Sequence, residues 1–121
     1  MKINDFVKTV HETAKSKGWY DKPRSPLEYH MLMVSELSEA TECVRKNKPA
    51  VYANDEENIV SDVTDISERK LKPEGEAVEL VDAIIRIADY FGYKGWDLEE
   101  MLQLKMNFND TRSYRHGNKT Y

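Results

Sequence analysis

The sequence contains little cysteine, proline and glycine, with one, four and five residues respectively among 121. The single cysteine, Cys43, excludes an internal disulfide framework and is typical of a reducing compartment. No apolar stretch approaches the roughly 20 residues that a membrane-spanning helix needs, and residues 1–12 lack a signal-peptide pattern. We therefore expect a cytoplasmic protein.

A basic excess is also absent. Lysine and arginine number 18 against 22 acidic residues, which gives a net charge of −4. Nucleic acids and anionic membranes both favour a basic surface, so we expect neither as a partner. A chain of this length forms one domain with a single core, and we expect that domain to span residues 1–121.

Apolar residues recur at helical spacing along most of the chain. The pattern predicts helices over residues 3–17, 26–46, 54–70, 76–91 and 97–112, with linkers at 47–52 and 72–75. The region 54–70 is the most acidic, which indicates a solvated helix face. No strand pattern is evident, and the expected fold is therefore all-α, a bundle of four to five helices.

Local signals mark the helix ends. Ser25, Pro26 and Glu28 form a strong helix start with a capping box. Two further capping boxes are expected, Asn54 with Glu57 and Asp97 with Glu100. Asn4 or Asp5 could cap the first helix, and Gly18 is expected to end it. Gly92 and Gly95 are expected to end the helix that begins at residue 76.

The segment 76–91, EAVELVDAIIRIADYF, is apolar almost all the way round, as in a buried helix. One narrow stripe is charged and contains Glu79, Asp82, Arg86 and Asp89 at spacings of three, four and three. Carboxylates on a buried helix cost free energy unless a cation or a hydrogen-bond donor meets them. Arg86 is expected to form ion pairs within this stripe.

Two carboxylate pairs stand out, Glu36 with Glu39 and Glu79 with Asp82, each pair one turn apart on its own helix. If the two helices pack antiparallel, four carboxylates converge and raise one another's pKa values. A divalent cation would compensate this charge. Because all the ligands are hard oxygens, the set favours Mg²⁺ or Mn²⁺ over zinc.

Two other interpretations of the acidic residues must be weighed. A lone E-x-x-E motif is usually a solvated helix face. A di-iron bundle also gathers carboxylates but uses Glu-x-x-His on two helices, and no histidine here lies three residues after a glutamate.

The last predicted helix carries Lys105, Asn109 and Arg112 on one face, and His116 and Lys119 follow in the tail. Cations and an amide beside a Mg²⁺ cluster are what a polyphosphate needs. The alternative is that the basic residues merely complement the dipole at the helix C-terminus.

These motifs resemble the MazG-like all-α nucleoside triphosphate pyrophosphohydrolases. The matching stretches are SELSEATECVRK (35–46), KPEGEAVELVDAIIRIADYFGYKGWDLEE (72–100) and KMNFNDTRSYRHGNK (105–119), with the lead-in AKSKGWYD (14–21). The resemblance implies Mg²⁺-dependent hydrolysis of a nucleoside triphosphate to a monophosphate and pyrophosphate. It also implies a homodimer or homotetramer with the active site near the subunit interface.

Carried over residue by residue, the resemblance implies a set of metal ligands and a set of phosphate contacts. The ligands are Glu36, Glu39, Glu79 and Asp82, and the phosphate contacts are Lys105, Asn109 and Arg112. Apart from the resemblance, we expect Glu39 to accept a proton, and we expect His116 and Lys119 in the basic tail as further phosphate contacts.

Some roles stay open at the level of sequence. Many members of this family have a second acid where this chain has Ser35, so Glu42 or Asp89 are alternatives for the missing carboxylate. Trp19 and Tyr20 either stack on a base or pack against the core. His30 faces either the nucleotide or the core. A non-catalytic helical module that binds nucleotide or a basic protein is the alternative function.

Overall fold

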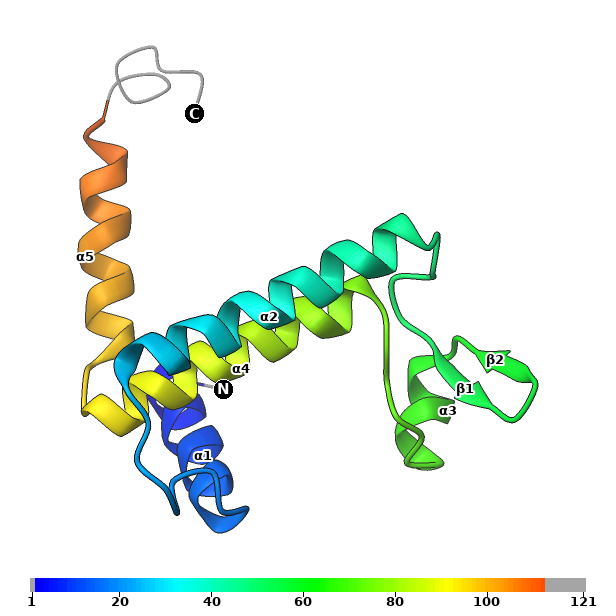
Figure 1. Cartoon of the computed structure of the whole chain (residues 1–121). Coiled ribbons are helices and arrows are strands. Elements are labelled where there is room, and N and C mark those ends of the chain that lie inside the picture. Colours follow the sequence, from blue (N-terminus) through cyan, green and yellow to red (C-terminus); the bar gives the residue numbers. More distant parts are fainter. Residues whose placement is uncertain (1, 113–121) are drawn as a thin grey trace.

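The computed structural model describes residues 2–112, which form five helices and one two-stranded antiparallel hairpin (Figure 1). A mostly helical fold is thereby confirmed. The elements are α1 Ile3–Ser16, α2 Pro26–Arg45, β1 Ala53–Asp55, β2 Asn58–Val60, α3 Val63–Glu68, α4 Glu76–Lys94 and α5 Leu98–Asp110.

The long helices α2 and α4 pack against each other along their length and run antiparallel (Figure 1). Small buried residues, Ala40 on α2 with Ala83 and Ala88 on α4, line the buried side of this pair. Helix α1 also packs on α4 and contributes the buried Val7. The core of this helical part therefore lies along α4, the most apolar helix of the chain.

The start of α2 is the expected capping box. The Ser25 hydroxyl accepts from the Glu28 amide at 3.3 Å, and the Glu28 carboxylate accepts from the Ser25 amide at 3.4 Å. Asp97 likewise caps α5 by accepting from the Glu100 amide at 2.8 Å. These local signals thus fixed both helix starts correctly.

Two expected helix ends differ from the structure. The N-cap of α1 is Lys2 and no side chain caps this helix. Asn4 instead donates to Asp97 Oδ1 at 3.0 Å and accepts from the Glu99 amide at 3.2 Å, which ties α1 to α5. Gly92 lies inside α4, which ends at Gly95 in the left-handed region (φ 71°).

The predicted helix over residues 54–70 is wrong. Residues 53–60 form the hairpin, with Asp55 opposite Asn58 and a turn at Glu56 (φ 55°). Only Val63–Glu68 are helical. Asn54 caps no helix; its amide donates to Glu74 Oε2 at 2.9 Å. Of the apolar residues of this region, Ile66 is buried whereas Ile59 and Val63 are exposed.

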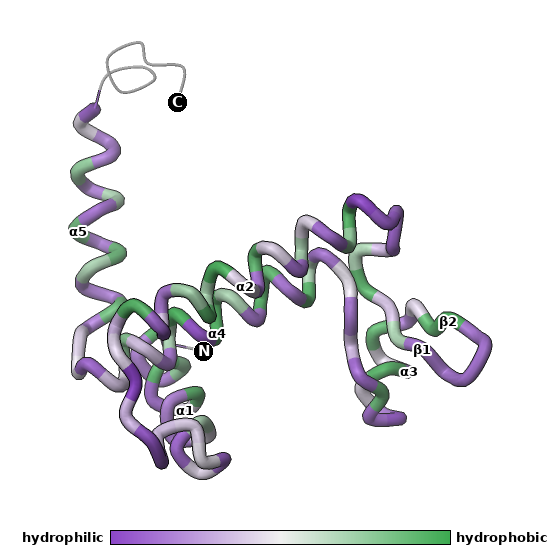
Figure 2. Tube along the Cα trace, viewed as in Figure 1, coloured by the Kyte–Doolittle hydropathy of each residue, from purple (hydrophilic) through white to green (hydrophobic). Residues whose placement is uncertain are grey.

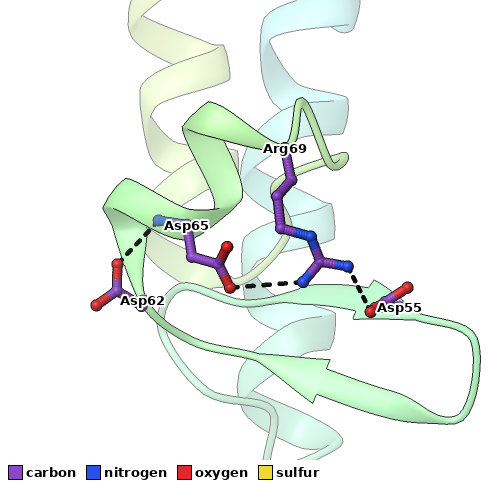
Figure 3. Close-up of polar contacts among 4 residues, drawn as sticks. All are labelled: Asp55, Asp62, Asp65 and Arg69. Atoms are coloured by element: carbon purple, nitrogen blue, oxygen red, sulfur yellow. Dashed lines mark hydrogen bonds and ion pairs between the residues drawn. The ribbon is translucent and has the colours of Figure 1, made fainter.

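Three acidic residues of this region form local hydrogen bonds and ion pairs (Figure 3). Asp62 caps α3 by accepting from the Asp65 amide at 2.9 Å. The Arg69 guanidinium donates to Asp55 Oδ2 at 2.5 Å and to Asp65 Oδ2 at 3.5 Å. The arginine therefore joins the hairpin to α3.

A pair of backbone hydrogen bonds between Tyr52 and Glu74 closes the base of this hairpin-and-helix unit. The chain then enters α4 at Gly75 (φ 117°), where an added Cβ would lie 2.3 Å from the Ala50 carbonyl oxygen. Any side chain there would clash with backbone, so the KPEG stretch needs glycine at this position.

In the single chain, α4 is not buried all round. Leu80, Val81, Ile84 and Ile87 are exposed. Helix α5 extends away from the α2–α4 pair (Figures 1 and 2). Its residues from Glu99 onward are exposed. Within residues 2–112, no helix combines the length and apolarity needed to cross a bilayer.

Gly92→Ala is predicted to destabilise the fold although alanine favours helices by about 1 kcal/mol over glycine. A Cβ at position 92 would lie 2.6 Å from His11 Cβ, so α1 and α4 would have to separate. Urea unfolding should give a lower free energy of unfolding. In a His11→Gly background, which lacks the clashing Cβ, Gly92→Ala should cost less than it does in the wild type. A stabilised Gly92→Ala protein would contradict the packing.

Candidate functional site

Helices α2 and α4 bring three of the four predicted metal ligands together. One carboxylate oxygen from each of Glu36, Glu39 and Glu79 lies within 4.8 Å of the other two. The antiparallel packing produces this cluster because each pair is one turn apart and faces the other helix. Asp82 lies one turn further along α4 and is outside this group of three.

Arg86 meets Glu36 rather than the acids of its own helix. Its Nε donates to Glu36 Oε1 at 2.7 Å, and the Glu36 side chain is only 9% exposed. The prediction that Arg86 pairs within its own stripe is wrong, because among residues 2–112 it forms its ion pair with Glu36 and none with Asp82 or Asp89. The Arg86 guanidinium also lies 5.2 Å from the centre of the Trp19 ring.

Proton affinity is raised on the α4 side of the cluster. Burial and the neighbouring carboxylates, Glu39 first, raise the pKa of Glu79 to about 7. Burial and Glu36 raise the pKa of Asp82, while a hydrogen bond from Glu79 and the charges of Arg86 and Lys72 oppose that rise. One arginine therefore does not neutralise this group of acids.

The donor set fits a hard divalent cation. Mg²⁺ binds oxygens at about 2.0–2.1 Å, so ligands on opposite sides of one ion are roughly 4.2 Å apart. The carboxylate oxygens here already lie within 4.8 Å of one another. Glu36, Glu39 and Glu79 would hold the ion with small side-chain movements, and Asp82 is close enough in sequence to join as a fourth ligand.

A pocket of about 270 Å³ adjoins the acidic residues. It lies between α1, the loop after it, α2 and α4. Its polar side chains include Glu36, Asp82 and Arg24, and its apolar ones include Trp19 and Ile85. Sequence reasoning overlooked Arg24; its position directly after the aromatic loop and before the capping Ser25 was the available signal.

The predicted phosphate contacts are not brought to this cluster within one chain. Lys105, Asn109 and Arg112 lie on or just after the exposed α5, and none of them lines the pocket. Lys105 and Arg112 instead approach the Phe108 ring, at 5.1 and 5.5 Å. The other two predicted contacts, His116 and Lys119, lie outside the described residues.

The remaining candidates have local roles. Ser35 donates to the Leu32 carbonyl at 2.6 Å. Glu42 approaches Lys46 on the exposed face of α2. Asp89 lies 2.8 Å from His11 Nδ1, a partner that the sequence did not suggest. Neither carboxylate joins the group of three.

Trp19, Tyr20 and His30, whose roles the sequence left open, lie in different surroundings. Tyr20 belongs to an aromatic cluster with Tyr29 and Tyr93, at 5.9 and 4.9 Å. Burial, followed by Asp89, raises the pKa of Tyr20. Trp19 is 43% exposed and lines the pocket, whereas His30 contacts Tyr90 edge to face at 5.6 Å.

Comparisons with protein-family models, with curated proteins and with solved structures find no match to this chain. The proposed function therefore rests on the residues described above and their geometry.

The raised pKa of Glu79 predicts pH-dependent stability. Its usual pKa is about 4.5, so the native state holds more protons than the unfolded state between pH 4.5 and about 7. Stability should fall as pH rises through this window and stay low above it, by less than the roughly 3 kcal/mol that the full shift would give, because solvent screens the partly exposed Glu79. Urea unfolding of the wild type and of Glu79→Gln, which should lack this fall, tests the assignment. An equal slope in both proteins would contradict it.

Proposed function

We propose that this protein hydrolyses a nucleoside triphosphate between the α and β phosphates in a Mg²⁺-dependent reaction, with Mn²⁺ as a possible substitute. The observation that carries the proposal is the convergence of Glu36, Glu39 and Glu79 from two helices. The adjoining pocket supports it, because a small organic group held there would be next to these carboxylates.

Each carboxylate has a distinct place in the proposed reaction. A bound Mg²⁺ would acidify a water molecule and neutralise phosphate charge. Glu36 is held by Arg86 and orients the cluster. Glu39 is the exposed member of the group, and its carboxylate would accept the proton of the attacking water.

Self-association is part of the proposal. Exposed apolar residues recur at helical spacing on α2 at Leu27, Met31 and Val34, and on α4 at Leu80, Ile84 and Ile87. Single chains rarely leave such rows in water. A second copy that covers them would form a dimer or a dimer of dimers, and its α5 is a possible source of the basic residues that the cluster lacks.

Pyrophosphate release is the decisive measurement. Each common ribo- and deoxyribonucleoside triphosphate, incubated with the protein and Mg²⁺, should be assayed for pyrophosphate, orthophosphate and nucleoside monophosphate. Glu39→Gln is predicted to reduce turnover by at least about a hundredfold, because it removes both a ligand and the base.

Glu42→Gln is the matched control, since Glu42 is exposed on α2 less than one turn further on and, among residues 2–112, pairs only with Lys46. It should keep near-normal turnover. Calorimetric titration with Mg²⁺ should show binding that Glu39→Gln weakens and Glu42→Gln does not. Orthophosphate as the product would indicate a different hydrolase, and nucleotide binding without any product would favour the non-catalytic module.

Ile84→Asp is predicted to dissociate the oligomer, because a charge at the centre of the α4 row would be buried in the interface. Light scattering coupled to size-exclusion chromatography measures the mass. Ile59→Asp on the hairpin is the control, since Ile59 is about equally exposed, at 56% against 54%. A wild-type protein that is monomeric and fully active would contradict the proposed assembly.

A further inference from the structure

Arg24 carries an unused hydrogen-bond donor at the pocket beside the carboxylate cluster. Its Nη1 atom is buried, and no residue within 2–112 accepts a hydrogen bond from it. Arg24 is also one of the residues that line the pocket. Tyr20 has a buried hydroxyl without a partner as well, but Tyr20 does not line the pocket.

An unpaired buried donor costs free energy, and in a charged group the cost is larger. Such a group in a native structure calls for an explanation, and a ligand in the pocket supplies one. A guanidinium has five N–H donors and no acceptor. The ligand must therefore present an acceptor to Arg24.

The surroundings of Arg24 indicate a flat ligand. Its guanidinium carbon lies 5.2 Å from the centre of the Trp19 ring, and Trp19 also lines the pocket. Because the guanidinium lies over the indole face, an aromatic ring in the pocket would pack beside this cation–π pair and present its edge to Arg24. Arg86 is equally close to Trp19, but its Nε is already engaged by Glu36.

Contacts across the pocket assign the Arg24 end to the base rather than to the phosphates. Arg24 lies against Trp19, Trp19 lies against Arg86, and Arg86 binds Glu36 of the carboxylate cluster. Arg24 is therefore separated from the cluster by Trp19 and Arg86. A substrate with its phosphates at the carboxylate cluster would therefore extend its nucleoside toward Trp19 and Arg24.

Arginine distinguishes bases by their acceptors. It pairs well with guanine, whose O6 and N7 acceptors lie side by side. On the corresponding edge of adenine, a ring-nitrogen acceptor lies beside an amino donor, and this pattern suits asparagine or glutamine. Guanine, cytosine, thymine and uracil all carry a carbonyl oxygen, and adenine does not.

We propose that Arg24 is a specificity-determining residue that donates to a carbonyl oxygen of the base and disfavours adenine. This inference rests on the proposed function for the orientation of the substrate.

Nucleoside binding tests the inference without metal, phosphate or turnover. The full chain with Trp96→Phe keeps Trp19 as its sole tryptophan. In EDTA, its fluorescence is titrated with guanosine, cytidine, uridine and adenosine. We expect the three carbonyl-bearing nucleosides to bind at least about tenfold more tightly than adenosine.

Three variants in the same background separate the possible roles. Arg24→Met should remove the preference by weakening the three carbonyl-bearing nucleosides. Arg24→Gln, which adds an acceptor beside its donors, should shift the preference toward adenosine, a gain that misfolding does not produce. Lys22→Met removes a positive charge from the same loop, outside the pocket lining, and should change nothing.

Several results would overturn the inference: equal binding of all four nucleosides, no quenching by any of them, or unchanged affinities in both Arg24 variants. If Arg24→Met weakens only nucleoside triphosphates, Arg24 contacts phosphate and the inference is wrong. The pyrophosphate assay separates the two proposals. Nucleoside selection by Arg24 without pyrophosphate release would refute the proposed hydrolysis alone, whereas release without such selection would refute the role of Arg24 alone.

Discussion

The contact between α2 and α4 forces like charges together, and the candidate site depends on that constraint. Ala40, Ala83 and Ala88 are buried at or beside this contact, and small side chains allow two helices to approach closely. Close approach places Glu36 and Glu39 opposite Glu79. Carboxylates at this distance disfavour one another's ionised forms. The packing energy of the helix pair therefore holds an excess of negative charge in place.

Arg86 compensates this charge only in part. Its single hydrogen bond goes to Glu36, the most buried acid of the cluster. Glu79 retains a pKa raised to about 7, so its negative charge is poorly stabilised by the chain alone. A folded protein that keeps an uncompensated acid in this position has a stability cost, and the proposed binding of a cation at this site would offset that cost.

The sequence predicted the site better than the periphery because the site depends on local rules. The Ser25 capping box and the three-residue spacing of the acids are fixed within a few residues, and one packing assumption then brought Glu36 near Glu79. The hairpin was missed because its acidic turn at Glu56 resembled a solvated helix. The flanking β-branched and aromatic residues, Tyr52 and Val60 among them, were the strand signal that helical periodicity obscured.

The hydrophobic pattern of the sequence could not show whether an apolar helix face is covered by the same chain or by a second copy. The hydrophobic residues of α4 predicted burial, yet Ile84 is exposed in the single chain. The same ambiguity affects α5, whose Lys105 and Asn109 were expected beside the acids but lie on a helix that extends away from α2 and α4 (Figure 1). If the proposed hydrolysis holds, both observations have one explanation: a second copy that covers α4 also brings basic residues toward the acidic cluster. Assembly would then complete the site as well as the core.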